Sequence, residues 1–225
     1  MYGRVSQRLN EGAAGPVFYP VSEIVARLNE ANRFFVLLTL GLEATGAWTI
    51  PAATACHHML TYFADWIVPL RIALVSGAKV RPAQIEELTG INPGWMSTPG
   101  TPSRYASEGC DFIALDRQPA APLVVNVIYA RAPLPLISDA DAPEVPAEYH
   151  SRLVDYAVYG MRQGEGGQEF EKSLRYFDSF LDGAQHYGEY VRSRNLGGRY
   201  DAVPFELSKL DRKQLLNAET QRAQR

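Results

Sequence analysis

Two amphipathic stretches separated by glycines, between residues 147 and 195, restrict most strongly what this chain can fold into. The first places on one helical face Tyr149, Leu153, Tyr156, Ala157 and Gly160. The second repeats apolar residues at alternating fours and threes, with one gap, at Phe170, Leu174, Phe177, Leu181, Ala184 and Val191. Gly164, Gly166 and Gly167 interrupt the pattern between them. We therefore expect an antiparallel αα-hairpin over 147–195.

A further amphipathic helix is expected near the N-terminus, over 22–42. Ser22 is a favourable N-cap, and Gly41 is a natural place for the helix to end. One face of this helix carries Ile24, Leu28, Ala31, Phe35, Leu38 and Leu42. That apolar face suits packing against the hairpin.

Residues 45–132 differ in character, because Gly, Pro, Thr and Trp punctuate short β-prone runs. The clearest run is LVVNVIYA, within 122–130, which is dense in β-branched residues. The other runs lie at 47–50, 59–63, 67–75 and 112–115. Pro82 and Gly90 bracket a short helix in PAQIEELTG. This pattern predicts a small, mostly antiparallel β section inserted between helices.

The expected fold class is therefore α+β: mainly a helical bundle, made of the N-terminal helix and the hairpin, with the β section inserted at 45–132. We expect residues 1–195 to form a single domain. Residues 196–225 have few apolar side chains, and a helix there is marginal alone, so we expect a C-terminal arm that orders on a partner.

Composition excludes several classes of protein. The formal net charge of −3 does not favour nucleic-acid binding by bulk electrostatics. Cys56 and Cys110 do not make a disulfide framework, and no stretch reads as a secretory leader or is long and apolar enough to cross a bilayer. We expect a soluble protein made in the cytoplasm, with no membrane partner.

Catalytic motifs are lacking, since the chain has no GxSxG, HExxH, GxxxxGK[ST] or strand-linked GxGxxG. His57 and His58 invite a metal site, but adjacent residues of a strand point to opposite faces and do not close on one ion. Asp155 lies on a helix flank, where we expect a capping or intersubunit contact. We expect no cofactor, no metal and no catalytic residue.

Aromatic residues on the hairpin are too numerous for one buried face. One interpretation is a core with scattered surface tyrosines, and the other is a second contact face, because Tyr and Phe are favoured at protein interfaces. On the second interpretation the candidate intersubunit residues are Tyr159, Tyr176, Phe180, Tyr187 and Tyr190.

The order of these elements resembles that of tailed-bacteriophage head-to-tail adaptor (connector, neck) proteins. The likeness covers about residues 20–195. It rests on ARLNEANRFFVLLT at 26–39, on the W…G.P..Y…G.D.IALDR.P run from Trp95 to Pro119, and on YHSRLVDYAVYGMR at 149–162 with the aromatic helix after it. HHMLTYFADW departs from the family by lacking a clear turn, and the arm has no motif to match.

The resemblance implies a structural virion protein in the neck, between capsid portal and tail. Its partners would be the portal protein, a tail or nozzle protein, and other copies of itself in a ring of about twelve. Double-stranded DNA would pass through the ring without sequence-specific binding, which a net charge of −3 suits. The portal anchors on the arm would be Phe205, Leu207, Leu210, Leu215 and Leu216.

Two alternatives stay open at this stage. One is another tail or neck component, such as a tail terminator. The other is a small cytosolic metal-dependent hydrolase that uses His57 or His58.

Overall fold

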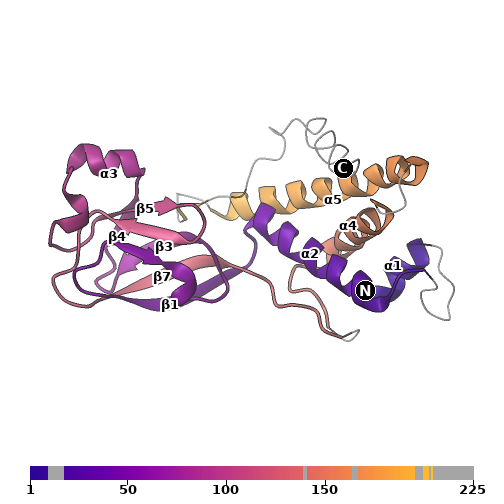
Figure 1. The fold of residues 1–225 in the computed structure, drawn as a ribbon, viewed down its shortest axis with the longest axis horizontal. Coiled ribbons are helices and arrows are strands. Elements are labelled where there is room, and N and C mark those ends of the chain that lie inside the picture. The colour runs from indigo at the N-terminus through magenta and orange to yellow at the C-terminus, as the bar shows by residue number, and fades with distance from the viewer. Residues whose placement is uncertain (10–17, 139–140, 164–166, 196–199, 203, 205–225) are drawn as a thin grey trace. The chain divides into compact units, whose positions relative to one another are not determined.

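The computed structural model describes residues 1–9, 18–138, 141–163, 167–195, 200–202 and 204. The chain divides into two compact units (Figure 1). The first, which we call the helical unit, comprises Met1–Gly41, Pro133–Ser193 and Pro204–Arg225. The second, which we call the β unit, comprises Leu42–Ala132 and Arg194–Val203. The chain therefore passes from one unit to the other four times.

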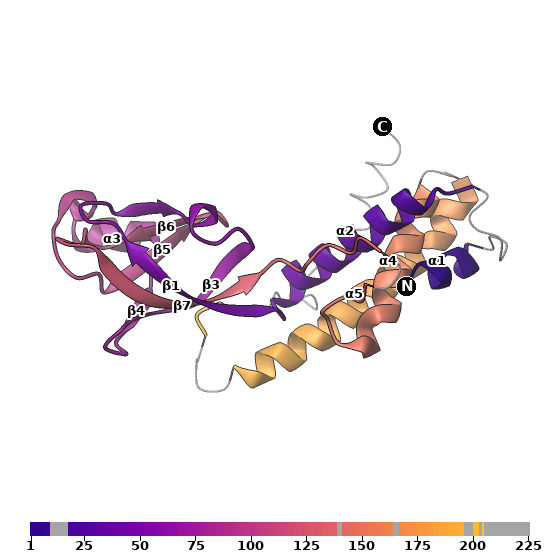
Figure 2. The same cartoon turned by 90° about the horizontal axis from the view of Figure 1, so that it is seen from below.

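The helical unit contains α1 (Tyr2–Arg8), α2 (Val21–Thr39), α4 (His150–Arg162) and α5 (Gly167–Arg194). Helices α2, α4 and α5 lie side by side in both views of the ribbon (Figures 1 and 2). Ile24 and Leu28 of α2 share a core with Val154 and Val158 of α4. Helix α5 packs on both helices through Phe180, whose ring centroid lies 5.6 Å from that of Phe34 and 4.8 Å from that of Tyr156. Helix α2 starts after Pro20 and ends where Leu40 takes a left-handed conformation, with its N–H donating to the Val36 carbonyl at 2.8 Å.

The β unit is built on a seven-stranded sheet in the order β1-β7-β3-β4-β5-β6-β2. The strands are β1 (Glu43–Ile50), β2 (Cys56–His58), β3 (Trp66–Leu74), β4 (Lys79–Pro82), β5 (Arg104–Glu108), β6 (Phe112–Leu115) and β7 (Leu123–Arg131). Neighbours pair antiparallel, except β4 and β5, which are parallel. Helix α3 (Ile85–Ile91) connects that parallel pair.

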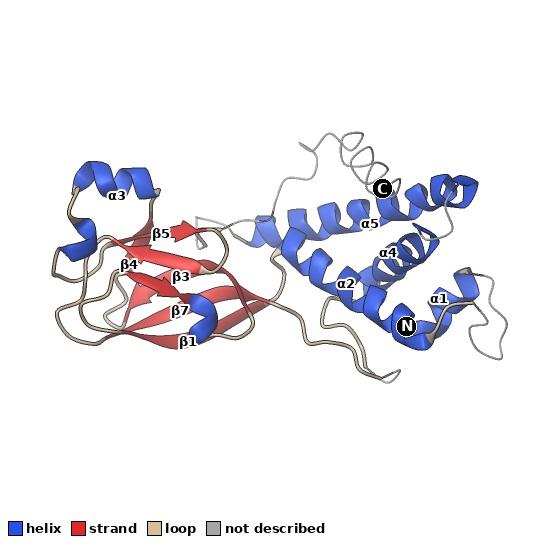
Figure 3. Ribbon diagram, viewed as in Figure 1, coloured by secondary structure: helices blue, strands red, loops and turns tan. Residues whose placement is uncertain are grey.

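The sheet curls into a half-barrel around its own apolar core (Figure 3). Trp48, Ile72, Tyr105, Ile113 and Val127 are among the buried residues that fill it. Trp48 on one edge strand lies with its ring centroid 4.9 Å from that of His57 on the other edge strand. The curl thus brings inward-facing side chains of β1 and β2 into contact.

The expectation of a mainly helical bundle with a small antiparallel β section is wrong. Strands make up 24 % and helices 44 % of the described chain, and the sheet is mixed and has its own core. Strands β2, β4 and β5 were not expected, because none of them contains the dense β-branched run that signals a strand. The predicted strand at 59–63 is a 3-10 helix at Met59–Thr61 instead.

Candidate functional site

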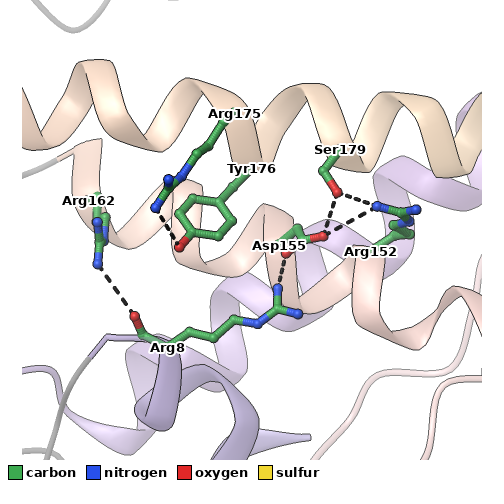
Figure 4. Close-up of polar contacts among 7 residues, drawn as sticks. All are labelled: Arg8, Arg152, Asp155, Arg162, Arg175, Tyr176 and Ser179. Carbon is green, nitrogen blue, oxygen red and sulfur yellow. Dashed lines mark hydrogen bonds and ion pairs between the residues drawn. The ribbon is translucent and has the colours of Figure 1, made fainter.

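Asp155 of α4 is the centre of a polar cluster inside the helical unit (Figure 4). Its carboxylate accepts from Arg8 of α1 and from the Ser179 hydroxyl of α5, the latter at 2.8 Å. Arg152, one turn earlier on α4, lies 3.8 Å from the same carboxylate and also donates to Ser179. The Asp155 residue is 5 % exposed, so its charge depends on these partners rather than on water.

This cluster joins three helices. Arg162 of α4 donates a hydrogen bond of 3.4 Å to the Arg8 carbonyl. Helix α1 is therefore attached to α4 through both the side chain and the backbone of Arg8 (Figure 4). A helix of seven residues is not stable by itself, and α1 depends on such contacts. Asp155 was expected at a capping or intersubunit contact. In the structure it stabilises the interior of one helical unit.

The five candidate intersubunit residues lie in three different environments. Phe180, Tyr159 and Tyr187 are 0 %, 2 % and 7 % exposed, so they pack inside the helical unit. Tyr176 is half-buried against the core that α1, α2 and α4 share. Tyr190 is 54 % exposed and stacks on Tyr187 with ring centroids 6.2 Å apart. The contact between subunits stays a prediction, and among these five Tyr190 is the residue that offers most surface to a partner.

Exposed apolar side chains occur on both units. On the helical unit, Phe18, Leu134 and Ile137 are 80 %, 67 % and 83 % exposed. On the β unit, the largest exposed fractions belong to Val75, Ile91 and Met96. Single exposed apolar residues are normal on a protein surface, and only a contiguous patch of them marks an interface.

The segment after α5 returns to the β unit and is held there. Asn195 and Tyr200 exchange two hydrogen bonds, the Tyr200 N–H donating at 2.7 Å and the Asn195 amide at 3.2 Å. The Tyr200 hydroxyl donates to the Glu43 carboxylate at 2.7 Å. Asp201 is half-buried as a residue, but its side chain is only 5 % exposed and lies 2.5 Å from the Lys79 ammonium.

A family model described as SU10 adaptor protein matches residues 1–200 of the 225. The chain belongs to this family of phage head-to-tail adaptors. No curated protein matches the chain. Membership in this family is consistent with a structural component of the phage neck.

The histidines of the adaptor lie as strand geometry predicts. His57 of β2 is 3 % exposed and His58, next to it, is exposed on the other face. Burial lowers the pKa of His57, and a hydrogen bond with the Thr54 backbone acts in the opposite direction. Within the described residues there is no group of three His, Cys, Asp or Glu side chains that could hold a metal ion.

The predicted portal anchors, Phe205, Leu207, Leu210, Leu215 and Leu216, lie outside the described residues. In the part of the chain that the structure describes, no helix is long and apolar enough to cross a membrane.

Sequence reasoning missed the ionic roles of Asp155 and Asp201. Their partners, Arg8 and Lys79, are 147 and 122 positions away in the chain, as the residue numbers show. No local pattern connects residues at such separations. At Asp155 the available signal was an acidic residue followed on the same helix face by Val158 and Tyr159.

Proposed function

We propose that this adaptor assembles into a ring of about twelve copies that binds the portal and presents a docking surface to the tail. The observation that carries the proposal is the family match over residues 1–200. DNA would leave the capsid through the ring. A net charge of −3 per subunit supports this role, because a strongly basic lining would hold the duplex by its phosphates.

A closed ring needs two different contact surfaces on each subunit. We assign Tyr190 to one of them, since it is more than half exposed and backed by the buried Tyr187 ring. The other four candidates would support this surface indirectly, by packing α4 and α5 into a rigid pair: Tyr159, Tyr176, Phe180 and Tyr187. We assign portal binding to the arm, through Phe205, Leu207, Leu210, Leu215 and Leu216.

The experiment is to mix the purified chain with the portal protein of the same phage and to measure the particle mass. We expect an increase of about twelve times 25.0 kDa. A chain that ends at Pro204 should fold but fail to bind. Unchanged binding by this truncated chain would show that the arm is not the portal anchor. No binding by the full chain at any salt concentration would overturn the proposal.

The subunit contact is tested separately with Tyr190→Ser. Because this side chain is exposed, the variant should keep the stability of the subunit and lose ring formation. Tyr62→Ser is the matched control, since Tyr62 is 39 % exposed on the β unit. Rings of normal mass from Tyr190→Ser would remove Tyr190 from the interface.

A further inference from the structure

Asp201 makes three bonds to three neighbouring strands of the β unit. Its carboxylate lies 2.5 Å from the ammonium of Lys79 on β4 and accepts at 3.0 Å from the hydroxyl of Tyr105 on β5. Its backbone N–H donates to the carbonyl of Leu70 on β3 at 2.6 Å. These strands are consecutive in the sheet. A single residue of the C-terminal segment is thus bound across the middle of the sheet.

The Leu70 carbonyl is available because of a proline. Strands β3 and β4 pair at Ile72 with Val80 and at Ala73 with Lys79, and the same register extended by two residues places Pro82 opposite Leu70. Proline has no N–H and cannot complete the ladder there. The Asp201 N–H takes the place of the missing donor.

The carboxylate of Asp201 is buried and therefore needs its partners to offset the loss of water. The Asp201 side chain is 5 % exposed, whereas that of Lys79 is 34 % exposed, so the acid and not the base carries the cost of burial. Burial, and secondarily the nearby Asp201 charge, raise the pKa of Tyr105, so its hydroxyl keeps the proton that it donates. Removing either partner would leave a buried charge short of a bond.

A second attachment follows three residues later. The Pro204 carbonyl accepts from Arg192 of α5 at 2.8 Å, and Pro204 is buried with its Cβ 3.4 Å from where a Cβ on Gly188 would lie. Phe205, the first predicted portal anchor, comes directly after it. Asp201 is thus bound within the β unit, and Pro204 is bound within the helical unit.

We propose that Asp201 is the positioning residue of the C-terminal arm: by binding Lys79, Tyr105 and the Leu70 carbonyl, it fixes on the sheet the part of the arm that precedes the predicted portal anchors. The inference rests on the proposed function, since it assumes that the arm binds the portal. It adds that portal affinity depends on a residue that does not touch the portal.

The test compares Asp201→Asn and Tyr105→Phe with wild type in the full chain. Hydrogen exchange of the peptide 195–203 should be faster by about tenfold or more, the size expected when a hydrogen bond to a charged group is lost. Portal affinity should fall by a similar factor. Lys79→Arg keeps the cation and should retain most of the exchange protection and most of the portal affinity. Glu87→Gln, which breaks the exposed pair with Arg104 on the same unit, is the control and should change neither.

The outcomes separate the two proposals. If exchange at 195–203 does not change in Asp201→Asn and Tyr105→Phe, the anchor is not Asp201 and the inference is wrong, whatever the portal does. If exchange rises while portal affinity stays the same, positioning is refuted but portal binding stands. The chain ending at Pro204 supplies the last comparison. In that background Asp201→Asn should have no effect on any residual portal binding, and an effect there would mean a general structural role.

Discussion

At the residue scale, Asp155 joins α1, α4 and α5 of the helical unit through its carboxylate. Its carboxylate is 8 % exposed and shared among Arg8, Arg152 and Ser179. We expect Asp155→Ala to lower the free energy of unfolding by about 3 kcal/mol, the lower part of the range for a broken buried pair, because both arginines are partly hydrated. Urea denaturation followed by circular dichroism at 222 nm measures this. Glu189→Gln on the exposed face of α5 is the control, with a change below about 0.5 kcal/mol.

His57 gives the β unit a dependence on pH. Its pKa is lowered in the folded state, so the unfolded chain takes up the proton first as pH falls through about 6.5. Stability is therefore complete above that pH and is lost as pH falls toward the lower folded pKa. His57→Phe should flatten the stability profile between neutral and mildly acidic pH, measured by urea denaturation. Parallel profiles for the variant and the wild type would contradict this assignment.

At the scale of elements, the surroundings of Gly46 and Gly160 lead us to expect opposite effects of a substitution to alanine. In β1, a Cβ on Gly46 would lie 2.5 Å from the ring of Phe63, which has little freedom to move. We expect Gly46→Ala to cost about 1–3 kcal/mol through overpacking. In α4, a Cβ on Gly160 would meet the flexible stem of Arg27 at 3.1 Å. Gly160→Ala should stabilise the helix by up to about 1 kcal/mol. Thermal melts of Gly46→Ala and Gly160→Ala measure both changes in stability. Destabilisation by Gly160→Ala as well would contradict the argument for that position.

At the scale of the whole molecule, the two units carry separate cores and separate spectroscopic signals. Trp48, Trp66 and Trp95 are all in the β unit, and they are the three tryptophans of the chain. Tryptophan fluorescence therefore reports the β unit, while ellipticity at 222 nm is dominated by α2, α4 and α5. We expect Asp155→Ala to shift the unfolding transition measured by ellipticity at 222 nm and to leave the transition measured by tryptophan fluorescence in place. A common shift would show that the units unfold as one cooperative body.

Local periodicity determined the helices. The expected helices at 22–42 and within 147–195 correspond to Val21–Thr39, His150–Arg162 and Gly167–Arg194. The β-branched run within 122–130 forms β7. These features were readable because side chains a few positions apart decide them, through the period of a helix or the β propensity of a run. The resemblance to phage adaptors also came from the sequence, and the family match confirms it.

Tertiary structure decided the rest. Strand β4 exists because β3 and β5 flank it, and the parallel pairing of Arg81 with Arg104 joins residues that no turn connects. Likewise, Tyr159 and Phe180 were ambiguous between core and surface until the packing of α2, α4 and α5 placed them inside. Asp155 and Asp201 each pair with a cation more than a hundred positions away in the chain. A sequence records which residues prefer an element, but pairing and burial depend on which segments the folded chain brings together.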